Sequence, residues 1–402
     1  MHFNEKLVLP IFYIVKEVLI EKKNADKSLQ FYFQKKTTLL PEDKEFVAEV
    51  VYDLIRNWRL LQESFGQNNE YIFKHPFAFF PSYYYYKKIE LPDTLKRVTF
   101  NKWEFNKRLT ENLTQRKFRN SYPDALDAYC ANDLGEEKWN SVSDALQQRP
   151  VRYIRINTLK TGKQELMNIL QKKKIRVKEV SGSPTALEIS SDAVVFSLPA
   201  FREGFFEIQD ISSQLVSEFL APEKGDKVID ACAGSGGKSL HLASLMQNKG
   251  KLVSMDVTEK KLEQLKKRAA RANVQIIETR LIEGDRSIKR YTDFADKVLL
   301  DVPCSGTGVF KRNPDAKWKI TPDNISNLIQ IQKNILKEYS VMCKSGGMMV
   351  YANCSVLPSE GEKQIVEFLK NNPQWELIEE KRIHPDKQNV DGFYMAKLKR
   401  NK

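Results

Sequence analysis

The sequence predicts an α/β protein in which a doubly wound, mostly parallel β-sheet is preceded by a helical domain and a small α/β module. Apolar residues recur at helical spacing from residue 7 to about residue 117, whereas after Pro150 short apolar runs alternate with amphipathic helices. Strand and helix repeated in this order are typical of a parallel sheet covered on both faces. We therefore expect a helical domain at 1–145, the small module at 146–205 and the doubly wound domain at 206–402.

The helical domain is best defined by residues 41–62, which place their apolar side chains on one face. Those side chains are Phe46, Val47, Val50, Val51, Leu54 and Ile55. Residues 75–90 interrupt the pattern with four consecutive tyrosines beside two lysines. Such rings can stack on nucleic-acid bases, but packing between helices is their more common use.

The small module is expected to contain strands at 151–160, 175–180 and 186–190 and a helix at 163–174. Its candidate phosphate contacts are Arg152, Arg155, Lys160 and Lys163, although an ordinary solvated face fits these residues equally well. In the doubly wound domain the expected strands are 227–231, 251–256, 275–281, 297–301, 347–354 and 392–400.

Composition limits the class of protein and its partners. The 402 residues are 41% hydrophobic and 29% charged, as in an ordinary globular chain, and no run approaches the ~20 apolar residues of a membrane helix. Five cysteines without a CxxC pair and four histidines argue against disulfides and structural zinc. The net charge of +13 favours nucleic acid as partner, with solubility as the alternative. We expect a cytoplasmic monomer with no membrane or metal partner.

A glycine-rich turn, "DACAGSGGKS", follows the first strand of the doubly wound domain. A P-loop would need glycine at Cys232, and a dinucleotide fingerprint starting at Gly234 would need glycine or alanine at Ser239. Asp256 ends the next strand, where a carboxylate can accept both hydroxyls of a ribose, and Asp285 follows the third strand. A nucleoside site without an obligatory phosphate indicates S-adenosylmethionine as cofactor.

Two thiols are expected at the same edge of the sheet. Asp301 ends the fourth strand, and Cys304 and Cys354 follow the fourth and fifth strands, where ligands of open parallel sheets bind. A methyl donor facing thiols suits methylation at carbon 5 of a pyrimidine, because this carbon becomes nucleophilic once a thiolate adds to carbon 6. A nearby cation such as Lys238 would favour the thiolate.

Three segments carry a family resemblance. "DVPCSGTGVFKRNPDAKW", "ANCS" and "ACAGSGGKS" resemble the fourth, sixth and first motifs of the RsmB/Sun-type RNA cytosine-5 methyltransferases. "RINTLK" and "GFFEIQDISSQL" resemble the sequence that precedes their catalytic domain, so that the resemblance covers about residues 152–399. It implies a class I methyltransferase fold, an RRM-like module before it and, more loosely, a NusB-like RNA-binding domain at the N-terminus.

The resemblance also implies roles that the residues alone leave open. A Pro-Cys motif by itself would suggest Cys304 as nucleophile, whereas in this family the later cysteine, here Cys354, attacks and Cys304 assists release of product. Asp301 would hydrogen-bond the cytosine edge, and Lys238 would lie beside the reacting base. The residues implied in cofactor binding are Cys232, Ala233, Gly234, Ser235, Gly236, Gly237, Lys238, Asp256, Asp285 and Asp301.

The chain departs from the family motifs at two places. Ser235 stands where the family has proline, which predicts a looser cofactor turn, and Asn353 stands where the family has threonine; neither change removes a reactive group. The expected substrate is 16S ribosomal RNA, with transfer RNA as the nearer alternative. The alternatives from other classes are a non-catalytic RNA-binding ribosome assembly factor and a methyltransferase for exocyclic amines.

Overall fold

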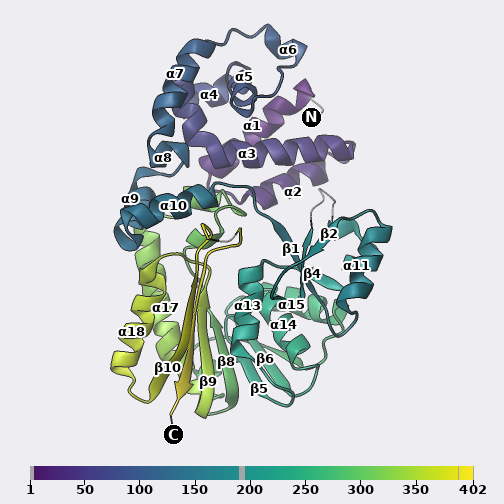
Figure 1. The fold of residues 1–402 in the computed structure, drawn as a ribbon, viewed down its shortest axis with the longest axis vertical. Helices are drawn as coiled ribbons and strands as arrows, with labels where there is room; N and C mark the ends of the chain where they lie inside the picture. The colour runs from purple at the N-terminus through teal and green to yellow at the C-terminus, as the bar shows by residue number, and fades with distance from the viewer. Residues whose placement is uncertain (1–3, 190–194, 388, 402) are drawn as a thin grey trace. The chain divides into compact units, whose positions relative to one another are not determined.

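The structure, a computed structural model, describes residues 4–189, 195–387 and 389–401 (Figure 1). The chain divides into two compact units. The first is Met1–Gln148 together with Phe310–Pro322, and the second is Arg149–Val309 together with Asp323–Lys402. Residues 310–322, which the sequence assigned to the doubly wound domain, therefore belong to the helical unit.

The first unit is helical throughout its described part. Its helices are α1 (Val8–Leu19), α2 (Ala25–Lys35), α3 (Pro41–Phe65), α4 (Asn69–Lys74), α5 (Pro76–Lys87), α6 (Asp93–Lys96), α7 (Lys102–Leu113), α8 (Arg116–Arg119), α9 (Asp124–Leu134) and α10 (Glu136–Leu146).

The core of the first unit confirms the predicted face of α3. Its six apolar residues from Phe46 to Ile55 are all at most 3% exposed. The tyrosine-rich stretch does not interrupt the helical pattern but forms α5, with Pro76 in its first turn. Tyr83 and Tyr84 are buried, and both rings pack against Phe80. These two tyrosines are therefore core residues rather than stacking platforms.

The segment Phe310–Pro322 is fastened into the helical unit by a buried lysine. Lys317 is 2% exposed, and its ammonium donates to the backbone carbonyls of Arg56 at 2.8 Å and Asn120 at 2.9 Å. Trp318 next to it donates its indole N–H to the carbonyl of Ile55 at 2.9 Å. Because a buried ammonium without acceptors is costly, these carbonyls hold the segment in place.

The second unit begins with a small antiparallel sheet of order β2-β3-β1-β4. Its elements are β1 (Arg152–Ile156), α11 (Lys163–Lys172), β2 (Val177–Glu179), β3 (Ala186–Ile189), α12 (Pro199–Arg202) and β4 (Phe206–Ile208). The expected boundary after residue 205 cuts off β4, which covers the free edge of β1. The module therefore extends to residue 208; residue 190, expected to end a strand, lies outside the described residues.

The large sheet has the order β10-β11-β9-β8-β5-β6-β7, with β5 to β9 parallel and β11 antiparallel to both of its neighbours. Its strands are β5 (Lys227–Asp230), β6 (Lys251–Asp256), β7 (Ile277–Leu281), β8 (Ala295–Asp301), β9 (Cys343–Asn353), β10 (Trp375–Ile383) and β11 (Phe393–Arg400). All six strands expected from the sequence are present, and β10 is the strand that the sequence analysis missed.

Helices cover both faces of the large sheet (Figure 1). Helices α13 (Ile211–Leu220), α14 (Gly237–Leu245) and α15 (Glu259–Arg271) pack on the face that carries Val228 and Leu299. Helices α16 (Asp285–Lys289), α17 (Pro322–Tyr339) and α18 (Glu362–Asn371) pack on the face of Ile229 and Leu300. Neighbouring strand residues thus enter opposite cores, which confirms the doubly wound fold. No helix in the described ranges is long and apolar enough to cross a membrane.

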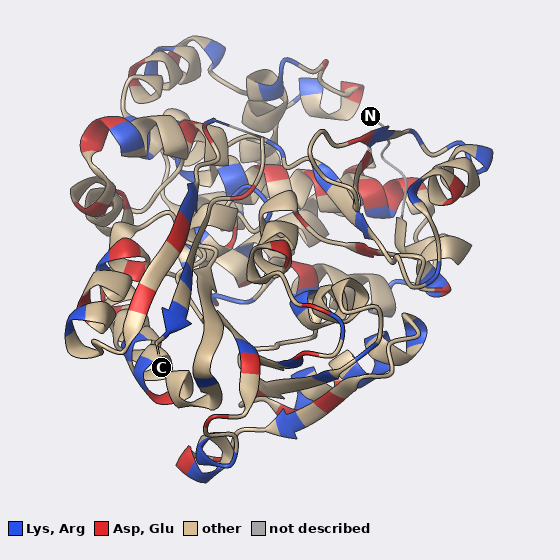
Figure 2. Ribbon diagram, turned by 60° about the horizontal axis from the view of Figure 1, so that its bottom comes forward, with Lys and Arg blue, Asp and Glu red and all other residues tan. Residues whose placement is uncertain are grey.

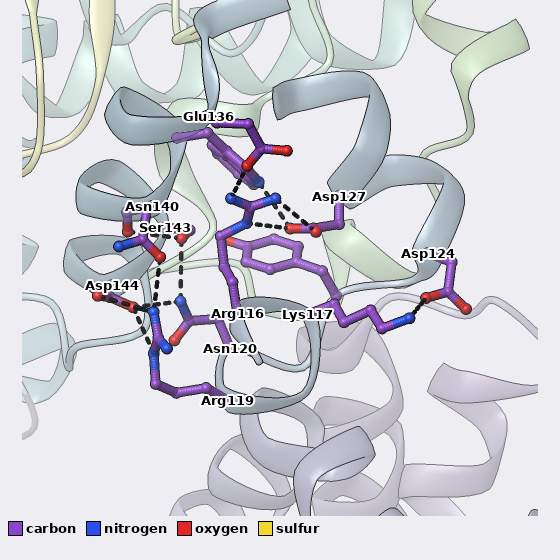
Figure 3. Close-up of polar contacts among 12 residues, drawn as sticks. Arg116, Lys117, Arg119, Asn120, Asp124, Asp127, Glu136, Asn140, Ser143 and Asp144 are labelled. Carbon is purple, nitrogen blue, oxygen red and sulfur yellow. Dashed lines mark hydrogen bonds and ion pairs between the residues drawn. The ribbon is translucent and has the colours of Figure 1, made fainter. Parts of the chain in front are cut away.

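A polar network joins α8, α9 and α10 within the first unit (Figure 3). Asp127, which is 7% exposed, accepts two hydrogen bonds of 2.9 Å from Arg116 and one of 2.8 Å from the indole of Trp139. Asp124 on the same helix is instead 65% exposed at its side chain and pairs with Arg59 at 2.9 Å and with Lys117 at 3.0 Å. The two aspartates therefore form a matched pair, one buried and one solvated.

Removing the buried carboxylate should cost far more than removing the exposed one. Asp127→Ala leaves the indole N–H of Trp139 without its acceptor and leaves the Arg116 guanidinium only Glu136 as acidic partner, and we expect a loss of about 3 kcal/mol in unfolding free energy. Asp124→Ala should cost at most about 1 kcal/mol. Urea unfolding followed by far-UV circular dichroism measures both, and equal losses would show that burial does not set the strength of this network.

Candidate active site

The cofactor turn lies between the end of β5 and the start of α14. Gly236 adopts φ of +89°, and a Cβ there would meet the side chain of Leu265 at 2.5 Å, so that glycine alone fits. Asp256 at the end of β6 is 7% exposed and accepts the Gly234 N–H at 2.9 Å and the Thr258 N–H at 2.8 Å. The structure thus brings the turn and this acid together, as the sequence predicted.

The other acid expected at this edge lies apart from the turn. Asp285 follows the carboxyl end of β7 as the first residue of α16, with its side chain 73% exposed and 3.9 Å from Lys289. No described contact links it to the glycine turn, so its role in binding remains a prediction from the resemblance.

The serine that replaces the family's proline is tied to a neighbouring helix. Arg268 of α15 donates to the carbonyl of Ser235 at 2.9 Å and to its hydroxyl at 3.1 Å, and it also pairs with Glu207 of β4 at 2.9 Å. The looseness expected from the loss of proline is therefore offset by an arginine that bridges the turn to the small module.

Basic residues of the small module also hold it to the large domain. Arg155 is 2% exposed and donates to the carbonyl of Gly237 at 2.6 Å, and Lys160 donates to the carbonyl of Arg271 at 2.8 Å. Lys163 donates to the carbonyl of Ser183 at 3.1 Å. Four side chains were expected to contact phosphates. The expectation is wrong for Arg155, which is buried, while Lys160 and Lys163 are engaged within the chain. Arg152 is half-buried in β1, and its phosphate contact stays a prediction.

A charged pair lies where the fourth strand ends. The Lys238 ammonium is 2.6 Å from an Asp301 carboxylate oxygen, and the two side chains are 11% and 28% exposed. Nearby, Asp230 at the end of β5 is 1% exposed and accepts the Ser239 hydroxyl at 2.6 Å. Burial raises the pKa of Asp230 to about 7.

The two thiols meet at the carboxyl edge of β8 and β9. The Sγ atoms of Cys304 and Cys354 are 3.3 Å apart, although fifty residues separate them in the chain. The hydrogen bond to Cys354, then burial, then the charges of Cys354 and Glu360, raise the pKa of Cys304 above its ordinary range. The other two described cysteines away from this edge and the cofactor turn, Cys130 and Cys343, are fully buried. The edge thus holds two adjacent thiols beside a lysine–aspartate pair.

Two residues that the sequence analysis did not assign shape this edge. A Cβ on Gly308 would meet the carbonyl oxygen of Gly392 at 2.1 Å and that of Cys354 at 2.8 Å, and the Gly308 N–H donates to the same Cys354 carbonyl at 2.9 Å. Glu360 is fully buried close to both thiol segments. The sequence signals that could have revealed them were a glycine shortly after Cys304 and an acid shortly after Cys354.

The fold and the site together define a class I methyltransferase that uses S-adenosylmethionine. The glycine turn and Asp256 lie at strand ends, where open parallel sheets bind their ligands, and the Gly234 N–H holds the Asp256 carboxylate at 2.9 Å. In the described part of the chain, no group of three or more His, Cys, Asp or Glu is arranged to hold a metal ion.

Comparison with known proteins identifies the family. Residues 217–399 match the model of 16S rRNA methyltransferase RsmB/F, and residues 116–195 match its ferredoxin-like domain. A probable ribosomal RNA small subunit methyltransferase B from Synechocystis is 32% identical over 70% of this chain and 67% of its own length. The corresponding protein of Proteus mirabilis is 33% identical over 65% of this chain and 61% of its length. The chain belongs to the RsmB/F family of 16S rRNA methyltransferases.

Solved structures confirm the fold. The crystal structure of PH0851 superposes with a TM-score of 0.78 over 100% of both chains at 23% identity. NSun6 from Pyrococcus horikoshii with SFG gives a TM-score of 0.64 at 21% identity over 70% of this chain and 98% of its own. A methyltransferase homologue from the same organism gives 0.63 at 27% identity over 71% of this chain and 97% of its own.

Gly308→Ala should displace the segment that carries Cys354. The added methyl group cannot fit between two backbone carbonyls, so that we expect methyl transfer to fall about 10- to 100-fold, as for a small misplacement of a reacting group. Gly162→Ala is the matched control, because nothing lies within 4 Å of a Cβ at that glycine. Initial rates with labelled S-adenosylmethionine measure the effect, and an unchanged rate in Gly308→Ala would contradict it.

Asp230 should make stability depend on pH. Its pKa is raised to about 7 in the folded chain from 3.8, so that between about pH 4 and pH 7 unfolding releases a proton and stability falls as the pH rises. Asp230→Asn removes this titration. As the pH rises across that window, the unfolding free energy of the variant minus that of the native protein should therefore increase, by up to about 1.4 kcal/mol per pH unit. Urea unfolding at several pH values measures the trend. The exposed Asp285→Asn serves as control, and a parallel pH dependence in both variants would contradict the assignment.

Proposed function

We propose that the protein transfers a methyl group from S-adenosylmethionine to carbon 5 of a cytosine in RNA, through a covalent bond between Cys354 and carbon 6. The observation that carries this proposal is the 3.3 Å approach of two thiols from separate strand ends beside the Lys238–Asp301 pair. Two adjacent thiols suit a reaction in which one adds to the base and the other assists its departure. The proposed substrate is small-subunit ribosomal RNA, modified in the cytoplasm.

Each group has a step in the proposed reaction. The thiolate of Cys354 adds to carbon 6, and the electron pair of the 5,6 double bond makes carbon 5 nucleophilic. The cofactor supplies the methyl group, and Asp256 and the turn from Cys232 to Lys238 would hold it. After transfer, water accepts the proton of carbon 5, the electron pair left behind re-forms the 5,6 double bond, and the carbon 6–sulfur bond breaks to return the thiolate of Cys354. Asp301 would hydrogen-bond the cytosine edge, and Cys304 would assist the release of Cys354.

The charge of the chain supports RNA as substrate. Lys and Arg are spread over many elements with acidic residues between them (Figure 2). The small module adds a local excess, because the exposed residues between positions 172 and 178 include Lys172, Lys173, Lys174, Arg176 and Lys178. Three of them line a surface groove of about 630 Å³. Such a cluster can neutralise phosphates, which contribute much of the affinity for RNA.

The site favours this function over its rivals. A non-catalytic assembly factor would have no need for the juxtaposed thiols or for the Lys238–Asp301 pair. A methyltransferase for exocyclic amines requires no thiol nucleophile. Transfer RNA remains the nearer alternative, and ribosomal RNA is preferred because the curated relatives described above are named small subunit methyltransferases.

Single-cysteine variants test the mechanism. Cys304→Ala can still attack and methylate but cannot readily release the base, so that it should accumulate an RNA–protein adduct that survives denaturing electrophoresis. The adduct should require S-adenosylmethionine. Cys354→Ala should form no adduct and should lose methylation while retaining its binding of RNA and cofactor.

The substrate and the control are included in the same assay. 16S rRNA and bulk transfer RNA are supplied separately, and bisulfite sequencing then locates the modified cytosine in the RNA that reacts. The Cys304→Ala/Cys354→Ala double variant is the control and should form no adduct. A stable adduct in Cys354→Ala would reverse the roles of the thiols, and reaction with transfer RNA alone would overturn the proposed substrate.

A further inference from the structure

Glu360 is a fully buried acid between the two thiol segments, and the proposed reaction gives it no role. It lies in the short 3-10 turn Pro358–Glu360 that follows β9. Burying a carboxylate is costly unless hydrogen bonds compensate it. Its partners therefore indicate what it holds in place.

The carboxylate of Glu360 holds the segment of Cys304. One oxygen accepts the backbone N–H of Ser305 at 2.8 Å, and the other accepts the hydroxyl of Ser305. Gln332 of α17 donates its amide to the carboxylate at 2.9 Å and to the carbonyl of Pro303 at 2.9 Å. The residues on both sides of Cys304 are thus fixed by one acid and one amide.

The backbone carbonyl of Glu360 holds the segment of Cys354. It accepts the side-chain amide of Asn353 at 2.7 Å and the hydroxyl of Tyr351 at 2.7 Å. The amide oxygen of Asn353 in turn accepts the Ser355 N–H at 3.0 Å. Asn353, the departure from the family's threonine, therefore fixes the turn around Cys354 and links it to Glu360.

The other charged groups around the thiols are paired. Lys238 pairs with Asp301 at 2.6 Å, and Arg382 pairs with Glu362. The Tyr351 hydroxyl is neutral, because burial holds its pKa above the ordinary range. Within the described chain, no lysine or arginine forms an ion pair with the buried carboxylate of the turn. Its negative charge is therefore balanced by hydrogen bonds, without a paired cation.

We propose that Glu360 is the positioning residue that decides which thiol attacks. Its carboxylate and its backbone carbonyl hold the segments of Cys304 and Cys354 in contact. Its negative charge keeps the proton on Cys304, so that the thiolate forms on Cys354. Two thiols 3.3 Å apart can share one proton. The Glu360 carboxylate accepts the N–H of Ser305, the residue after Cys304, so that its negative charge favours the protonated form of Cys304. The hydrogen bond to Cys354 and burial raise the pKa of Cys304 most, and the charge of Glu360 acts in the same direction.

Thiol titrations measure the bias without RNA. In a Cys354→Ala background, the rate of Cys304 alkylation by iodoacetamide is measured against pH by peptide mass spectrometry, with and without Glu360→Gln. Glutamine keeps the size of the side chain and removes the charge. We expect the titration of Cys304 to move down by about one pH unit, so that alkylation near neutral pH becomes about tenfold faster.

Controls separate charge from structure. In a Cys304→Ala background, Glu360→Gln should move the titration of Cys354 by less than half as much. Glu367→Gln, on α18 with its side chain 48% exposed, should move neither. Glu360→Asp retains the charge and should keep the native titration of Cys304 even where the shorter side chain lowers stability. Equal shifts at both thiols, or an unmoved Cys304, would overturn the proposal.

The native protein gives a second measurement in case Glu360→Gln fails to fold. In the unsubstituted chain, iodoacetamide near neutral pH should alkylate Cys354 faster than Cys304, and the opposite order would overturn the proposal. The assigned nucleophile rests on the proposed function, but these titrations do not. If the adduct assay fails but the titrations are as expected, Glu360 biases a thiol pair that does not methylate cytosine. If the adduct assay succeeds but Glu360→Gln leaves the titration of Cys304 unchanged, only the role of Glu360 is overturned.

Discussion

The parallel pairing of β8 with β9 is the constraint on which the site depends. Asp301 lies opposite Ala352 in this ladder, so that the chain leaves both strands at one edge and carries Cys304 and Cys354 to 3.3 Å from each other. The register is fixed because alternate residues of β8 enter opposite cores, and a slip of one residue would turn Leu300 toward the wrong face. The apolar packing of β8 and β9 therefore sets the distance between the two sulfur atoms, although both cysteines lie beyond the ends of these strands.

Much of this site could be predicted from the sequence, because its elements obey local rules. The parallel strands are apolar runs that end in an acid or a glycine turn, and parallel strands deliver those ends to one edge. The placement of Asp256, Lys238 and the two thiols follows from that rule. The roles of the thiols came instead from a resemblance, since the geometry of two sulfurs in contact is symmetrical.

What could not be predicted depends on contacts between distant segments. Strand β10 was missed because it is rich in charge and its register shifts between Leu377 and Glu379, which breaks the two-residue alternation. Arg155 appeared to be a surface cation, but its partner is a carbonyl more than eighty residues away. The burial of Glu360 depends on Ser305 and Gln332, neither of which is close to it in sequence.

The insertion of Phe310–Pro322 into the helical unit has a consequence for how this protein can be divided. The chain passes between the two units three times, and two of these passages flank a segment that starts six residues after Cys304. A fragment that ends at Gln148 would lack Lys317 and Trp318, whose donors occupy the carbonyls of Arg56 and Ile55. The helical unit therefore cannot be exchanged between related proteins by recombination at a single junction. A junction after Gln148 would transfer that unit without its segment Phe310–Pro322.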